Sequence, residues 1–95
     1  MPAITLTVNN AVGLHARPAA IFVKTAKAFP CHITLRNLTS ARAVANAKSP
    51  LAVLTQAVQH GHRIEIAAEG ESAEQALAAL RRLVESDFAE GSGPA

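Results

Sequence analysis

Four stretches of the chain alternate between apolar and polar positions, and they predict strands. The alternation covers residues 3–8, 32–36, 41–46 and 63–67. A period of two is typical of a strand with one buried face. The second and third stretches flank a polar turn at residues 37–40, so we expect them to pair as an antiparallel hairpin.

Three other stretches carry helical signals. Residues 16–28 contain an apolar stripe at helical spacing, formed by Ala19, Phe22, Val23 and Ala26. This predicted helix ends at Phe29-Pro30, because the residue before a proline disfavours helical backbone. Ser49 followed by Pro50 predicts the start of a short helix that runs to about residue 58. Ser72 and Gln75 predict a capping box at the start of a last helix, whose inner stripe is Ala76, Leu80, Leu83 and Val84.

The expected order of elements is β-α-β-β-α-β-α, in a chain of 95 residues, the length of one small domain. This order predicts an α+β open-faced sandwich, in which a four-stranded antiparallel sheet carries three helices on one face and meets solvent on the other. We assign residues 1–88 to this domain. The glycine-rich residues 89–95 are expected to form a flexible C-terminal tail.

Composition excludes several classes of protein. The chain is 49% hydrophobic and 17% charged, which is typical of a globular domain. It contains neither an apolar run long enough for a membrane span nor a leader-like start, so membrane insertion is not expected. The single cysteine, Cys31, rules out an internal disulfide and suits a reducing compartment. We therefore expect a cytoplasmic protein.

Charge is distributed unevenly along the chain. Every charged residue before Arg63 is basic, and every acidic residue lies from Glu65 onward. A basic surface over the first two-thirds of the chain favours an acidic protein partner or an anionic group. Nucleic acid is not expected as a partner, because the chain has three aromatic residues and single-strand binders stack bases on aromatic rings.

The strongest chemical signal is the GLHARPAA segment that starts at Gly13. His15 stands at the N-cap of the first helix, where Ser, Asp or Asn is usual. The first turn presents the backbone amides of Ala16 and Arg17 with a partial positive charge, and the Arg17 guanidinium adds donors suited to phosphate oxygens. A histidine beside such a cradle is explained if its imidazole is phosphorylated. From spacing alone, a solvated capping histidine beside a surface arginine is the alternative.

This segment resembles the active-site signature of HPr, the family of histidine-containing phosphocarriers of the bacterial sugar phosphotransferase system. The resemblance extends from Ile4 to about Ser86 and includes Ala47-Lys48-Ser49. It implies that His15 is the phosphoacceptor, modified at Nδ1, and that Arg17 contacts the phosphoryl group and the incoming protein. It also implies enzyme I as donor and enzyme IIA components as acceptors. We expect a monomeric carrier that needs no cofactor and is not an independent turnover enzyme.

The resemblance also points to regulation and docking. Ser49 resembles the serine that HPr kinase/phosphorylase modifies, although a plain helix cap is the alternative and Pro50 stands where the family usually has another apolar residue. The outer face of the first helix and the helix after it predict a docking surface of Ala20, Ile21, Lys24, Lys27, Leu51 and Leu54. A solvated helix face is the alternative interpretation.

The sequence is also compatible with other functions. The chain could be a regulatory or nitrogen-related paralogue that acts through protein binding, or a carrier domain fused to others. An acylphosphatase-like hydrolase is a rival from another class, but no second catalytic polar group stands beside His15. The His60-Gly61-His62 sequence offers only two potential ligands, so no metal site is expected.

Overall fold

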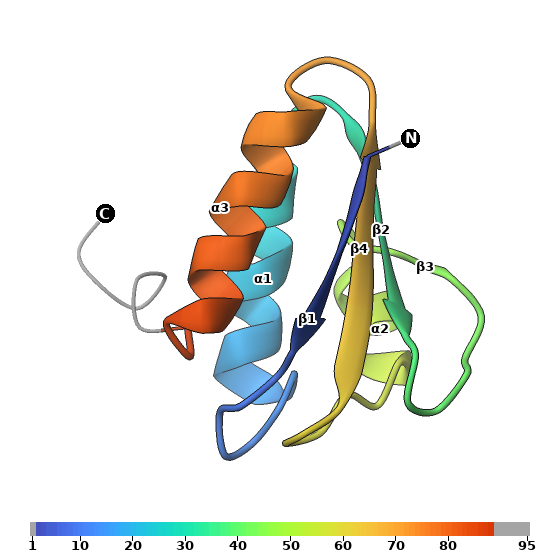
Figure 1. Cartoon of the computed structure of the whole chain (residues 1–95), viewed down its shortest axis with the longest axis vertical. Coiled ribbons are helices and arrows are strands. Elements are labelled where there is room, and N and C mark those ends of the chain that lie inside the picture. The colour runs from blue at the N-terminus through green and yellow to red at the C-terminus, as the bar shows by residue number, and fades with distance from the viewer. Residues whose placement is uncertain (1, 89–95) are drawn as a thin grey trace.

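The structure, a computed structural model, describes residues 2–88 and has the expected order of elements (Figure 1). Its strands are β1 (Ala3–Thr7), β2 (His32–Asn37), β3 (Ala45–Asn46) and β4 (Arg63–Glu69). Its helices are α1 (Ala16–Lys27), α2 (Pro50–Thr55) and α3 (Ala73–Glu85). The predicted tail, residues 89–95, lies outside the described residues. No helix in the described part is long and apolar enough to cross a bilayer.

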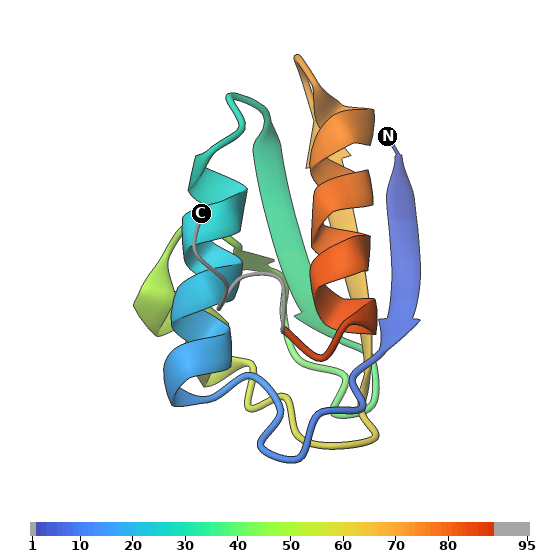
Figure 2. The same ribbon diagram turned by 90° about the vertical axis from the view of Figure 1, so that its left-hand side faces the viewer.

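The strands form one antiparallel sheet in the order β1-β4-β2-β3, which confirms the predicted α+β open-faced sandwich. β4 lies between β1 and β2, so that Ile66 faces Ile4 on one side and Leu35 on the other. Figure 2 shows α1 and α3 side by side over one face of this sheet. On the other face, Thr5 and Thr7 are exposed, as the period of two predicts.

The core lies between the sheet and the two long helices. All four residues of each predicted helical stripe are buried, and Phe22, Ala76 and Leu80 are fully enclosed. Apolar burial of this kind is the main source of stability for a domain of this size. The short helix α2 contacts α1 and β3 and so lies beside the first helix.

The structure corrects three of the expected boundaries. The third strand is limited to Ala45 and Asn46, because the chain turns through Ala41 at a positive φ of 52° before it pairs with β2. Helix α2 ends at Thr55 rather than near residue 58, since Ala57 adopts a φ of 53° that a right-handed helix does not allow. The fourth strand is longer than expected and continues to Glu69.

The predicted capping box of the last helix is wrong. Ser72 has a φ of 65°, in the left-handed region, and its side chain makes no capping hydrogen bond. Its carbonyl still accepts a hydrogen bond from the Ala76 N–H at 2.9 Å, so the helix begins where expected but without the side-chain exchange.

Candidate functional site

A firmly held loop leads from β1 into α1. The Leu14 N–H donates to the Val58 carbonyl at 3.0 Å, and the Leu14 side chain is 1% exposed. Gly13 has a φ of 66° and lies so close to the neighbouring backbone that a Cβ would come within 2.3 Å of the Val58 oxygen. The Asn10 Nδ2 donates to the Gly13 carbonyl at 2.8 Å. The backbone that precedes His15 is therefore fixed by buried and hydrogen-bonded contacts.

His15 is the N-cap of α1, as the sequence predicts. Its backbone is extended, with φ −120° and ψ 158°, and its carbonyl accepts from the Ala19 N–H at 3.4 Å. The imidazole is exposed and makes no capping hydrogen bond. An exposed ring at a helix N-terminus can be reached by a reactive group on another protein.

The backbone conformation of Ala16 is not predicted by the sequence, although its amide is an expected phosphate donor. This first residue of α1 has a φ of 45°, in the left-handed region that alanine rarely adopts. Such a backbone typically costs about 1–3 kcal/mol. It also occurs in this chain at Ala41, Ala57 and Ser72, outside the site. Nothing in the sequence signals it, because alanine is an ordinary helix residue.

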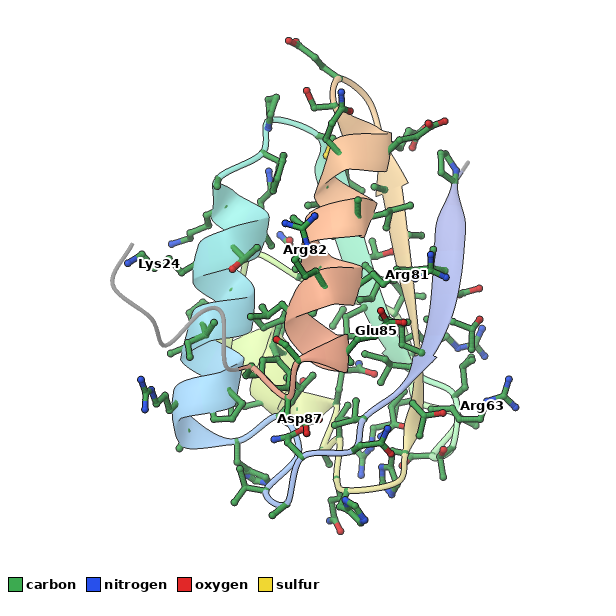
Figure 3. All side chains as sticks on the ribbon, turned by 60° about the vertical axis from the view of Figure 1, so that its left-hand side comes forward. Lys24, Arg63, Arg81, Arg82, Glu85 and Asp87 are labelled. Atoms are coloured by element: carbon green, nitrogen blue, oxygen red, sulfur yellow. The ribbon has the colours of Figure 1, made fainter. Side chains whose placement is uncertain are left out.

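The start of α1 is electrostatically suited to an anion. Its first turn contains no acidic residue, and Arg17 is exposed there. Pro18 contributes no backbone N–H, so the turn presents those of Ala16 and Arg17. The partial positive charge of the helix N-terminus adds to that of the guanidinium. Lys24 extends from α1 away from the sheet, whereas Arg63 projects on the sheet side (Figure 3).

Five of the six predicted docking residues are exposed, on the contacting helices α1 and α2. Ala20, Lys24 and Lys27 are exposed on α1, and α2, in contact with α1, exposes Leu51 at 72% and Leu54 at 41%. Ile21 differs from the expectation. It is half-buried and packs against the core, because α1 turns this side chain partly inward.

Ser49 caps α2, with Pro50 as the first helical residue. Its hydroxyl oxygen accepts from the Ala52 N–H at 3.3 Å. This contact confirms the capping interpretation, and modification of Ser49 stays a prediction.

The two histidines around Gly61 contact backbone. The His60 Nδ1 lies 3.0 Å from the Asn9 carbonyl, and the His62 Nδ1 accepts from the Gln59 N–H at 3.2 Å. Within residues 2–88, no three His, Cys, Asp or Glu side chains gather into a potential metal site.

Comparison with known sequences gives one consistent family. The family model described as the PTS HPr component phosphorylation site matches residues 3–86. The chain is 40% identical over 92 residues to the phosphocarrier protein HPr of Pseudomonas aeruginosa, and the match covers 96% of this chain and 99% of that protein. It is 41% identical over 86 residues to a multiphosphoryl transfer protein of Haemophilus influenzae, which covers 90% of this chain. The match spans only 17% of the length of that protein.

Solved structures agree with the sequence matches. HPr of Thermoanaerobacter tengcongensis superposes with a TM-score of 0.87 at 39% identity, covering 93% of this chain and 96% of that one. The histidine-containing phosphocarrier protein of Mycoplasma gives a TM-score of 0.81 at 31% identity, with coverage of 92% and 97%. Another T. tengcongensis structure, of an HPr dimer, gives 0.72 at 39% identity and covers 93% of this chain and 98% of that one.

Proposed function

The chain belongs to the HPr family of phosphocarriers of the phosphotransferase system, and from that premise we propose that His15 is its phosphoacceptor. The observation that carries the proposal is the exposed imidazole at the N-cap of α1, directly before Ala16 and Arg17. A ring nitrogen of His15, which the resemblance to HPr places at Nδ1, attacks the phosphorus of a donor. The N–P bond forms as the bond from phosphorus to the donor breaks, and the donor leaves with the electron pair.

The surroundings of His15 suit a carrier that must also release its cargo. Phosphoryl transfer requires mainly the positioning of groups and the stabilisation of charge. The amides of Ala16 and Arg17 and the Arg17 guanidinium supply donors for the phosphoryl oxygens. A helix N-terminus stabilises an exposed anion by typically about 0.3–1 kcal/mol, which is weak enough for the group to pass on.

The proposed partners are enzyme I as donor and enzyme IIA components as acceptors. The basic residues of α1 and the exposed leucines of the adjoining α2 support this, because α1 begins at His15 and they offer positive and apolar side chains to a partner. Transfer distinguishes this function from the rival one, a regulatory or nitrogen-related paralogue that acts only by binding.

Intact-mass measurement after incubation with enzyme I and phosphoenolpyruvate tests the proposal. We expect one added phosphoryl group, about 80 Da, that is lost in acid as a phosphoramidate would be. His15→Ala should gain nothing. The matched control, His60→Ala, removes another exposed histidine and should be phosphorylated like the parent. A His15→Ala protein that still gains this mass would refute the assignment.

A further inference from the structure

Asn37 and Gln56 are buried polar residues outside the proposed site, with exposed fractions of 0% and 4%. Burying a polar group costs free energy unless it is hydrogen-bonded. Here the two are bonded to each other twice. The Asn37 N–H donates to the Gln56 Oε1 at 2.7 Å, and the Asn37 Nδ2 donates to the Gln56 carbonyl at 3.0 Å.

Asn37 also contacts His62, six residues beyond Gln56. The Asn37 Nδ2 lies 3.1 Å from the His62 Nδ1, which also accepts from the Gln59 N–H at 3.2 Å. Both groups that face Nδ1 are donors, so this nitrogen is the acceptor and the ring proton lies on Nε2. The Asn37 side chain therefore contacts both ends of the segment 56–62. We call Asn37, Gln56 and His62 the Asn37 cluster.

The segment that the Asn37 cluster fastens supports the loop before His15. Its Val58 carbonyl accepts the Leu14 N–H, and Gly13 lies directly against the backbone of Val58 and Gln59. At its far end, the His62 carbonyl accepts the Val8 N–H at 2.9 Å. Figure 2 shows the loop after β1 and the segment before β4 at the end of the molecule where α1 begins.

We propose that the Asn37 cluster positions His15 for phosphoryl transfer. The cluster fixes the position of the segment 56–62. That segment fixes the Gly13–Leu14 backbone, which in turn fixes the position of His15 at the N-cap of α1. Buried, directional hydrogen bonds suit this role, because misplacing a reacting group by about 1 Å can slow a reaction by about 100-fold. This inference rests on the proposed function of His15 and adds residues distant from it in sequence.

The key variants alter the hydrogen bonds of the Asn37 cluster. Asn37→Asp replaces a donor with an oxygen that faces the Gln56 carbonyl and the His62 Nδ1. His62→Ala removes the acceptor, and His62→Gln can return an acceptor oxygen. Leu77→Ala is the stability control, since this α3 side chain is 6% exposed and has no polar atom that could hydrogen-bond to the segment 56–62.

Three measurements are made at a temperature at which every variant is folded. They are the rate of transfer from phosphorylated enzyme I, hydrogen exchange of the Leu14 amide, and the NMR signals of the His15 ring. We expect Asn37→Asp and His62→Ala to slow transfer by about 10- to 100-fold, speed Leu14 exchange and shift the His15 signals. His62→Gln should recover most of the loss, and Leu77→Ala should transfer within about 2-fold of the parent.

The outcomes separate this inference from the proposed function. Folded cluster variants that transfer at the parental rate would overturn the positioning role, as would a Leu77→Ala protein slowed as much at equal stability. If Asn37→Asp does not fold, the comparison of His62→Ala with His62→Gln tests the positioning role. If the parent accepts no phosphoryl group, the proposed function fails, and unchanged Leu14 exchange and His15 signals in the variants would then refute the cluster independently.

Discussion

At Gly13, the absence of a side chain lets the loop before His15 lie flat against Val58. The residue needs both a positive φ and a space that a Cβ would fill. Gly61 is a matched control, because its φ is also positive, at 86°, but a Cβ there would meet nothing within 4 Å.

Gly13→Ala should destabilise the protein more than Gly61→Ala does. Left-handed backbone costs an L-residue about 1–2 kcal/mol, so Gly61→Ala should lose about that much unfolding free energy. Gly13→Ala has the same cost and also a clash with the backbone of Val58 and Gln59. It should therefore lose clearly more unfolding free energy and also slow phosphoryl transfer. Urea unfolding and transfer kinetics measure both effects. Equal losses in the two variants would show that the contact with Val58 is unimportant.

Arg17 is expected to stabilise the charge of the phosphoryl group rather than the fold. Its side chain is exposed at the start of α1, so Arg17→Ala should leave the melting temperature nearly unchanged. Transfer should slow by about 10- to 1,000-fold, as when one donor to a transition-state charge is removed. Stopped-flow transfer and thermal unfolding give the two readouts. The control is Arg36→Ala, an exposed arginine on β2, which should transfer normally. A parental rate in Arg17→Ala would contradict the assignment.

At the scale of elements, the two serines that precede helices behave differently. Ser49 accepts a hydrogen bond from the Ala52 N–H, whereas the Ser72 side chain makes no capping bond. Ser49→Ala should therefore lose about 1 kcal/mol of unfolding free energy, and Ser72→Ala should lose less than half of that. Chemical denaturation of both variants measures the difference. Equal losses would mean that the Ser49 hydroxyl does not stabilise α2.

Periodicity predicted the long elements because burial on one face determines them. The stripes from Ala19 to Ala26 and from Ala76 to Val84 point to the core wherever the helices pack. Shorter elements depend on contacts between distant residues. The turn after β2 is set by the Asn37 Oδ1, which accepts from the N–H groups of Thr39 and Ser40 at 3.0 and 3.2 Å, so β3 begins later than alternation predicts.

The candidate site was predictable only in part, for a similar reason. His15 and Arg17 are recognisable as a motif with a chemical purpose. The support from Val58 is not, because it arises from packing between segments more than 40 residues apart. The left-handed backbone of Ala16 has no signal in the sequence either.

At the scale of the whole molecule, basic side chains and exposed apolar side chains lie on two helices that contact each other, α1 and α2. Lys24 and Lys27 lie on α1, and Leu51 is exposed on the adjoining α2. We propose that this is the docking surface for enzyme I. Attraction between opposite charges raises the association rate, while a small apolar centre gives an affinity near micromolar, about −8 kcal/mol, that allows quick release. Leu51 tests the apolar part better than Ile21, whose replacement would also disturb the core.

Replacing Lys24 and Lys27 with Glu should weaken binding to enzyme I mainly through a slower association rate. The deficit should shrink in high salt, since exposed charges are screened over about 10 Å at 0.1 M. Leu51→Glu should also weaken binding, but with less dependence on salt, because it removes apolar contact. The matched control reverses two exposed charges on the sheet, Arg36 and Arg63, and should bind like the parent. Binding kinetics across a salt series decide the matter. If the sheet variant loses as much as the α1 variant, net charge rather than a docking surface on α1 and α2 governs the encounter.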